Sequence, residues 1–268
     1  MQRIRIRYAK RGRLRFTSHR DFARAFERAL RRAGTPIAYS QGFTPHPKIS
    51  YASAAPTGAA SEAEYLEIGL QRPVDPASLR EALDAALSPG LDVLEAVEAR
   101  GSGGLAERID AARWRVELPG VAPAALDAAV AAFLAAPEVV VERLTKQGRR
   151  PVDARASVVS IEVVHAAGAG ADGPDGRGGA GAVDPHHAGP EVPSGVAAVP
   201  CAILDLVVRQ VTPTVRPDDV LSGLRAVADL EPPVPPRATR LAQGTLTAQG
   251  QILDPLRADR DEAVIEER

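Results

Sequence analysis

The chain has 268 residues, of which 45% are hydrophobic and 25% are charged, and both fractions are ordinary for a globular protein. Its single cysteine, Cys201, excludes an internal disulfide and any cluster held by cysteines of this chain alone. No apolar run reaches the roughly 18–20 residues that span a bilayer, and the N-terminus lacks the apolar core of a secretory signal. We therefore expect a cytoplasmic protein in which Cys201 is buried as a small hydrophobe.

The overall net charge of −1 conceals a strong asymmetry along the chain. The first fifty residues carry thirteen basic and two acidic side chains, a net charge of +11, and the remaining residues together carry −12. Such polarisation predicts a local anion-binding surface on an otherwise acidic body. Complementarity between the two parts of the chain is the alternative.

Residues 2–8 alternate strictly between arginines and apolar residues. A period of two predicts a strand with one buried face, which here carries Ile4, Ile6 and Tyr8. The same alternation resumes at residues 13–16 after a turn. We expect five arginines to point outward from the sheet: Arg3, Arg5, Arg7, Arg13 and Arg15. The alternative is that they pair with glutamates of a neighbouring strand, namely Glu62, Glu64 and Glu67.

A helix is predicted to follow, with Ser18 as its N-cap and Gly34 and Pro36 beyond its end. Phe22, Phe26 and Leu30 recur at helical spacing and predict a buried stripe. A second, basic stripe on another face consists of Arg20, Arg24, Arg28 and either Arg31 or Arg32.

The remaining pattern predicts strands near 36–40, 48–54, 64–70 and 91–97 and a helix over 76–87. This β-α-β-β-α-β order is typical of a ferredoxin-like sandwich, assigned to residues 1–100. After a linker at 101–111, residues 112–250 repeat the plan. Their expected strands lie at 114–118, 138–145, 157–164, 203–208 and 239–246, and their helices at 123–135 and 217–228.

The sequence thus predicts an α+β protein of two ferredoxin-like sandwiches in tandem. Residues 166–199 are rich in Gly, Ala and Pro and cannot bury enough apolar surface to offset their ordering entropy, so we expect a disordered insert. The charged residues 251–268 are expected to form a flexible tail.

Two loops carry further candidate binding residues. The loop Gln41–Lys48 is stiffened by two prolines and presents Phe43, His46 and Lys48, which suit stacking on a base and holding a phosphate. A basic turn presents Lys146, Arg149 and Arg155, which predicts either a second phosphate contact or, through Asp153 and Arg155, a lock between domains.

Two histidines are the candidate acid–base groups. Asp21 lies close enough along the chain to orient His19 for proton transfer, and His46 is the second candidate. A plain helix-cap residue and a plain surface histidine are the alternatives. No dinucleotide fingerprint, P-loop, zinc-protease motif or nucleophile elbow is present, so we expect no cofactor and no metal.

Several segments resemble a bacterial family of radical-SAM-associated proteins whose domain is of unknown function. The resemblance covers roughly residues 1–250 and is carried by Ser18–Asp21, Arg28 with Arg31 and Arg32, Gly42–Ser50, Ser61–Tyr65 and Val152-Asp153-x-Arg155. Arg20 departs from the apolar residue expected in the family's helix motif, and the insert at 166–199 is peculiar to this chain.

The resemblance implies an accessory role, because members occur alone or fused behind a radical-SAM enzyme, often encoded near an E/G-type ribonuclease and a ribosomal protein. This chain has no Cys-x-x-x-Cys-x-x-Cys motif and matches the accessory part only. We expect a non-catalytic protein that binds tRNA or rRNA for a separately encoded radical-SAM enzyme. The alternatives are a metal-independent endoribonuclease of tandem ferredoxin-like type, by analogy of fold and charge alone, and a protein-interaction module.

Overall fold

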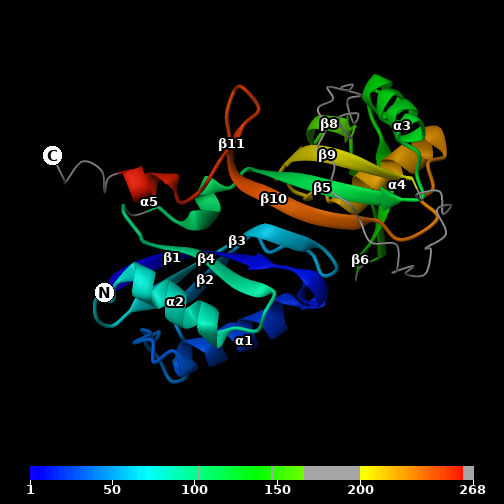
Figure 1. The fold of residues 1–268 in the computed structure, drawn as a ribbon. Helices are drawn as coiled ribbons and strands as arrows, with labels where there is room; N and C mark the ends of the chain where they lie inside the picture. The colour runs from blue at the N-terminus through cyan, green and yellow to red at the C-terminus, as the bar shows by residue number, and fades with distance from the viewer. Residues whose placement is uncertain (102, 146–147, 166–199, 262–268) are drawn as a thin grey trace, which may run out of the picture.

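The structure is a computed structural model that describes residues 1–101, 103–145, 148–165 and 200–261. It confirms the predicted α+β class, with a large sheet flanked by helices (Figure 1). The expected disorder of the insert at 166–199 concerns residues outside the described ranges, as does the candidate Lys146.

The first half of the chain forms four antiparallel strands in the order β4-β1-β3-β2. Two helices, α1 and α2, lie together on one face of these strands (Figure 1). The elements are β1 (Gln2–Lys10), a 3-10 helix (Gly12–Phe16), α1 (His19–Arg32), β2 (Ile49–Ala52), β3 (Ala60–Leu70), α2 (Pro76–Ala86) and β4 (Leu91–Glu98).

The second half has the corresponding order β10-β5-β9-β8, also antiparallel, with α3 and α4 on one face. A separate two-stranded hairpin, β6–β7, is inserted between α3 and β8. The elements are β5 (Ala111–Pro119), α3 (Pro123–Ala135), β6 (Val140–Thr145), β7 (Gly148–Asp153), β8 (Val158–Val164), β9 (Cys201–Arg209), α4 (Pro217–Ala228) and β10 (Arg237–Leu246).

Local sequence signals explain the helix starts. The Ser18 hydroxyl accepts a hydrogen bond from the backbone N–H of Asp21 at 3.2 Å, which confirms the predicted N-cap of α1. Asp75 caps α2 in the same way, with Ser78 N–H at 2.8 Å and Pro76 in the first turn. The apolar stripe of α1 packs on β1, where the Tyr8 and Phe22 rings stack with centroids 4.3 Å apart.

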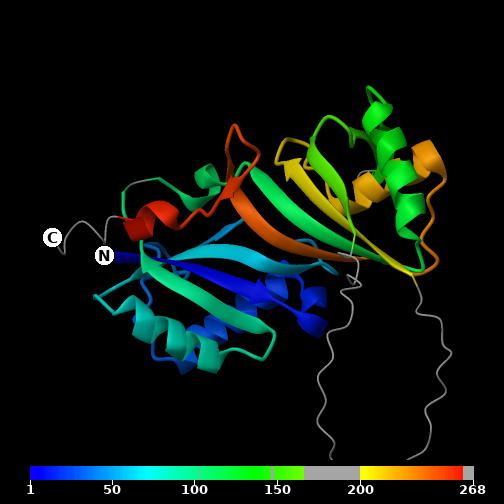
Figure 2. The same ribbon diagram turned by 45° about the horizontal axis from the view of Figure 1, so that its top comes forward.

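The two halves have separate hydrophobic clusters but share one continuous sheet. β3 and β10 run parallel and pair over a short stretch, Ala60 with Thr239 and Ser61 with Arg240 (Figure 2). A buried ion pair between Glu64 and Arg240 lies at this junction, and the Arg240 guanidinium is 5.5 Å from the centre of the Trp114 ring. The junction is therefore held by buried charge as well as by backbone pairing.

In the first half, α1 and α2 cover one face of the sheet. The opposite face is covered by segments that the sequence predicts to be a linker and a flexible tail. The predicted linker contains a 3-10 helix (Leu105–Arg108), and the predicted flexible tail contains β11 (Ile252–Leu253) and α5 (Arg257–Asp261). Leu105 and Leu256 are buried in a small third cluster on this face. β11 pairs antiparallel with the end of β10, and the two backbones are so close that a Cβ atom at Gly244 would lie 1.8 Å from the Leu253 carbonyl oxygen.

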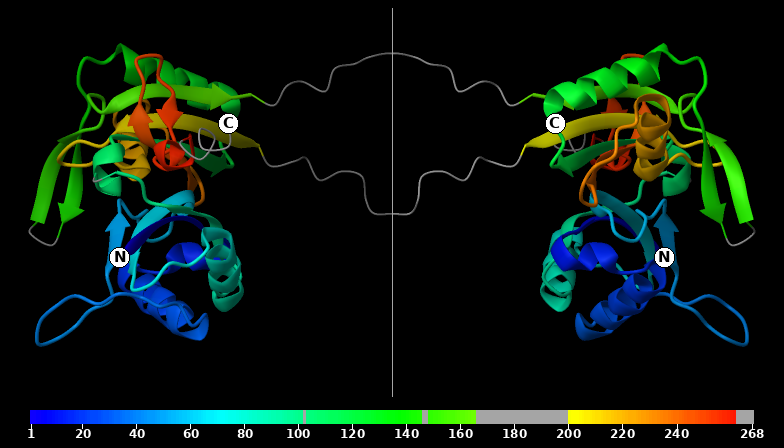
Figure 3. Two further views of the ribbon diagram at one scale, coloured as in Figure 1. Left: turned by 90° about the vertical axis from the view of Figure 1, so that its left-hand side faces the viewer. Right: turned by 90° about the vertical axis from the view of Figure 1, so that its right-hand side faces the viewer.

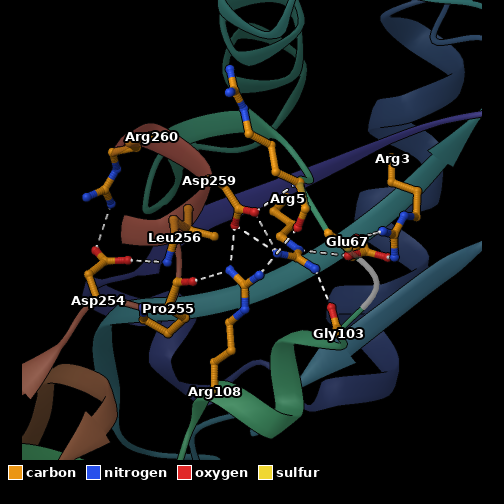
Figure 4. Close-up of polar contacts among 12 residues, drawn as sticks. Arg3, Arg5, Glu67, Gly103, Arg108, Asp254, Pro255, Leu256, Asp259 and Arg260 are labelled. Atoms are coloured by element: carbon orange, nitrogen blue, oxygen red, sulfur yellow. Dashed lines mark hydrogen bonds and ion pairs between the residues drawn. The ribbon is translucent and has the colours of Figure 1, made fainter. Parts of the chain in front are cut away.

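The buried carboxylate of Asp259 anchors this covering layer. It accepts two hydrogen bonds from the Arg5 guanidinium, at 2.7 and 2.8 Å, and one from Arg108 at 2.7 Å (Figure 4). The backbone N–H of Arg100 adds a fourth at 2.9 Å. The side chains of Arg5 and Asp259 are both 0% exposed, so both charges must be compensated by charged partners inside the fold. The expectation of a flexible tail is wrong for these described residues.

Two smaller predictions also fail. Cys201 is exposed rather than buried, because it is the first residue of β9 and lies at the end of the strand. Residues 36–40 make only isolated bridges, Ile37 with Leu70 and Tyr39 with Pro47, and do not form a strand.

Replacing Asp259 by Ala should destabilise the protein by about 3–5 kcal/mol, because it removes the carboxylate that Arg5 shares with Arg108 and leaves Glu67 as the remaining counter-charge of the fully buried Arg5. Urea unfolding measures this. The control Glu81→Ala removes an exposed carboxylate on α2 and should change the free energy of unfolding by less than about 0.5 kcal/mol. Equal effects of the two substitutions would contradict the anchoring role of Asp259.

The free energy of unfolding should fall as the pH rises above about 10. Burial raises the pKa of Tyr8, Tyr51 and Tyr65 above the ordinary value, so the unfolded chain loses protons that the folded protein keeps. Burial lowers the pKa of Lys10, which gives an opposite slope only below its ordinary value. Denaturant unfolding at stepped pH, followed with tyrosinate absorbance, measures the effect. Ionisation of all four tyrosines in the folded protein would contradict it.

Candidate nucleic-acid interface

The first predicted binding surface, the arginine face of β1, is not available to a ligand. The prediction that Arg3, Arg5 and Arg7 point into solvent is wrong, because the covering layer lies on that face. Glu67 pairs with Arg5 at 2.8 Å and with Arg3 at 3.4 Å, and Arg7 lies 3.4 Å from Asp254.

The alternative pairing with strand β3 is therefore correct in part. Glu67 takes two of the arginines of β1, and the Glu62 carbonyl accepts from Arg7 Nε at 2.9 Å. Glu64 does not take part, because it pairs with Arg240 across the junction of the two halves. Most of the positive charge of β1 is thus compensated inside the fold.

Arg13 and Arg15 do not continue a strand, since residues 12–16 form a 3-10 helix. Gly12 has a φ of +54°, which turns the chain out of β1 and into this helix. Arg13 is exposed, whereas the Arg15 guanidinium lies 4.6 Å from the centre of the Phe16 ring. This pair leads directly into α1.

The outer face of α1 carries a row of exposed basic side chains. Arg20, Arg24 and Arg28 are exposed at successive four-residue steps, and within the described part of the chain none of them has a carboxylate partner. Arg31 extends the stripe and lies 3.8 Å from Glu27. Exposed cations without counter-charges are available to a phosphate backbone.

The loop after α1 is closed at its base by Ser40. The Ser40 N–H donates to the His46 carbonyl at 2.8 Å, and the His46 N–H donates to the Ser40 hydroxyl at 3.0 Å. Gly42 has a φ of +135°, a conformation that favours glycine. Phe43 at the tip is 110% exposed, and the His46 and Lys48 side chains are exposed as well. The loop therefore presents an aromatic ring beside basic groups, as predicted.

The third candidate cluster lies on the β6–β7 hairpin. Arg149 is exposed and contacts Glu142 across the hairpin at 3.0 Å. Asp153 accepts from the backbone N–H groups of Val139 and Arg155 at 3.2 and 2.9 Å, so it closes the hairpin and not an interface between the halves. Arg155 has a buried Nε with no hydrogen-bond partner. The hairpin and loop 39–48 project toward the same side of the molecule (Figure 3).

The histidine candidates are not arranged as an acid–base pair. Asp21 accepts from the Ser18 hydroxyl at 2.7 Å instead of orienting His19. The His19 ring contacts Tyr51 edge-on, with centroids 4.8 Å apart. In the ranges that the structure describes, neither His19 nor His46 has a carboxylate within hydrogen-bonding distance. These residues also include no group of three or more side chains suited to a metal ion.

The free face of the second half is open but balanced in charge. Asp205 on β9 lies between Arg113, at 2.7 Å, and Arg115, at 3.9 Å. This face therefore does not replace the covered arginines of β1, whereas α1 presents a row of three arginines without carboxylate partners among the described residues. No helix in the described ranges is long and apolar enough to cross a membrane.

A family model matches residues 3–217, from β1 to the first residue of α4. The chain belongs to the family DUF2344, an uncharacterized protein family conserved in bacteria. The matched range includes all of the candidate residues described above. No curated protein matches the chain.

Ser40→Ala should loosen the loop, because it removes the hydroxyl that accepts the His46 N–H. We expect chymotrypsin to cleave after Phe43 several-fold faster, in line with the loss of one hydrogen bond of about 1 kcal/mol. Ser50→Ala is the matched control, since the exposed Ser50 hydroxyl makes no bond with the described residues. Cleavage of Ser40→Ala at the wild-type rate would show that Ser40 does not hold the loop.

Proposed function

We propose that the protein is a non-catalytic RNA-binding accessory protein that holds tRNA or rRNA for a separately encoded radical-SAM enzyme. The observation that carries the RNA part is the row of unpaired Arg20, Arg24 and Arg28 on α1. Three guanidinium groups spaced along three turns match a backbone of repeating negative charge.

The loop supports the same interface. It follows directly after α1 in the chain, and Phe43 stands fully in solvent on a closed loop. A lone exposed phenylalanine gains nothing from that position in the folded chain. Stacking on an unpaired base gives it a partner, and His46 and Lys48 lie on the same loop to contact phosphate.

The fold is compatible with this role. We propose that each half is a ferredoxin-like sandwich, the second interrupted by the β6–β7 hairpin, since the strand orders β4-β1-β3-β2 and β10-β5-β9-β8 correspond. The RNA surface differs from the one expected for an open sheet. It lies on the helix side of the first half, because the sheet side is covered by the chain itself.

The partnership with a radical-SAM enzyme rests on the family resemblance. These 268 residues include a single cysteine and cannot hold an iron–sulfur cluster alone, so we propose that a separate enzyme supplies the radical chemistry. An accessory protein of this kind contributes binding and orientation of the RNA. A pull-down that survives nuclease treatment, with RNA binding absent, would favour the protein-interaction alternative instead.

The triple variant Arg20→Ala, Arg24→Ala, Arg28→Ala tests the interface by titration with tRNA at several salt concentrations. Wild-type binding should weaken as salt rises, and the variant should bind more weakly at low salt with a log–log slope smaller by about 2–3. The RNA should be recovered intact. Cleavage that is abolished by His19→Ala or His46→Ala would favour the endoribonuclease alternative.

A control variant removes the same charge from the second half, by Ala substitution of Arg113, Arg115 and Arg225, which are all substantially exposed. It should keep most of the affinity. Equal losses in the two triple variants would mean that net charge alone attracts the RNA, and an unchanged affinity of the α1 variant would refute the proposed interface.

A further inference from the structure

A cavity of about 290 Å³ opens between the two halves, next to the start of α1. The first half contributes Arg15 and Phe16 and the turn that precedes β3. The second half contributes Asp218 at the start of α4 and the segment Pro235–Ala238, which leads into β10. The cavity thus exists only because β3 and β10 pair at the junction.

Its walls are stiff. The Gly58 N–H donates to the Arg15 carbonyl at 2.8 Å, which ties the 3-10 helix to the turn before β3. Proline residues 56, 217, 235 and 236 fix the backbone on the other sides and offer carbonyl oxygens without N–H groups. A site with this construction changes little when a ligand enters it.

The residues that line the cavity are suited to a planar, polar ligand. The Phe16 ring is 59% exposed and carries the Arg15 guanidinium on its face, 4.6 Å from the ring centre. The exposed Asp218 carboxylate has no ion-pair partner among the residues that the structure describes. An aromatic ring, a guanidinium plane and a free carboxylate can stack on a heterocycle and accept its N–H groups.

The size of the cavity restricts the ligand to one small group. Its volume is at the lower end of the roughly 300–1,000 Å³ of small-molecule sites. A helix or a stacked pair of bases does not fit into such a space, whereas a single heterocycle does.

The cavity lies close to the arginine row of α1 along the chain. Phe16 ends the 3-10 helix, and only Thr17 and Ser18 separate it from the first residue of α1, His19. Arg20 lies in the first turn of α1. A nucleic-acid backbone that follows Arg28, Arg24 and Arg20 along α1 therefore arrives beside the cavity.

We propose that this cavity takes one unstacked nucleobase of the bound RNA, with Phe16 and Arg15 on its face and Asp218 accepting its exocyclic amino group. The inference rests on the proposed RNA-binding function and specifies its substrate class, an RNA with an unpaired, amino-bearing base. Among pyrimidines, cytosine has this amino group and uracil lacks it. Asp218 is accordingly the residue that distinguishes them.

Three blunt RNA duplexes test the proposal: one fully paired, one with a single bulged cytidine and one with a single bulged uridine. The wild type should bind the cytidine bulge most tightly. Phe16→Ala should weaken binding of that duplex by roughly 5- to 150-fold, the equivalent of one lost stacking interaction, and leave the fully paired duplex unaffected. Asp218→Asn should abolish the preference for cytidine over uridine.

Val234→Ala is the matched control, because Val234 is 46% exposed beside the cavity and does not line it. It should bind all three duplexes like the wild type. Phe16 and Asp218 are exposed, so their variants should fold, which circular dichroism verifies. Equal affinity of the wild type for the paired and bulged duplexes would overturn the proposal.

The proposal for the cavity and the proposal for the α1 interface can be tested separately. Titration with cytidine monophosphate, followed by NMR, tests the cavity without the α1 arginines. Binding that is lost in Phe16→Ala and kept in the triple arginine variant supports the cavity, even if the triple variant binds the fully paired duplex as tightly as the wild type does. No binding of the mononucleotide by the wild type, together with no preference for a bulge, refutes the cavity and leaves the α1 interface standing.

Discussion

The buried contact between Arg5 and Asp259 governs the arrangement of the rest of the molecule. A guanidinium group with no solvent exposure is tolerated only if its charge and its donors are fully compensated, and Asp259, Glu67 and the Gly103 carbonyl do so. This requirement draws the predicted linker and the last helix onto the sheet. The arginines of β1 therefore serve the interior of the protein, and the basic surface offered to a ligand lies on α1.

Local rules predicted much of the secondary structure. The helices at Pro123–Ala135 and Pro217–Ala228 have the expected bounds, and the Ser18 cap is present, because caps, prolines and apolar spacing act within a few residues. The fate of Arg5 could not be predicted in this way. The alternation places Arg5 on the face of β1 that does not carry Ile4 and Ile6. The same alternation is compatible with an arginine exposed to solvent and with one covered by a distant segment.

The candidate site likewise combines local features, which the sequence predicts, with features that depend on distant segments. The α1 stripe and the rigid loop with Phe43 depend on helical periodicity and on proline and glycine, so the sequence predicts them. The cavity at Phe16 and Asp218 combines residues from both halves and depends on the β3–β10 pairing. The predicted strand at residues 13–16 concealed it, because an alternating pattern four residues long does not distinguish a strand from a 3-10 helix.

The contact between Arg5 and Asp259 joins residues 254 positions apart. During synthesis, β1 leaves the ribosome long before Asp259 exists. Within the first half, Glu67 is the carboxylate that pairs with its arginines, and the covering layer forms only after residues 254–261 have been made. Until then the nascent first half exposes Arg3, Arg5 and Arg7 together. The native state is therefore complete only after α5 has been translated. A chain released before that helix would keep the basic face of its sheet uncovered.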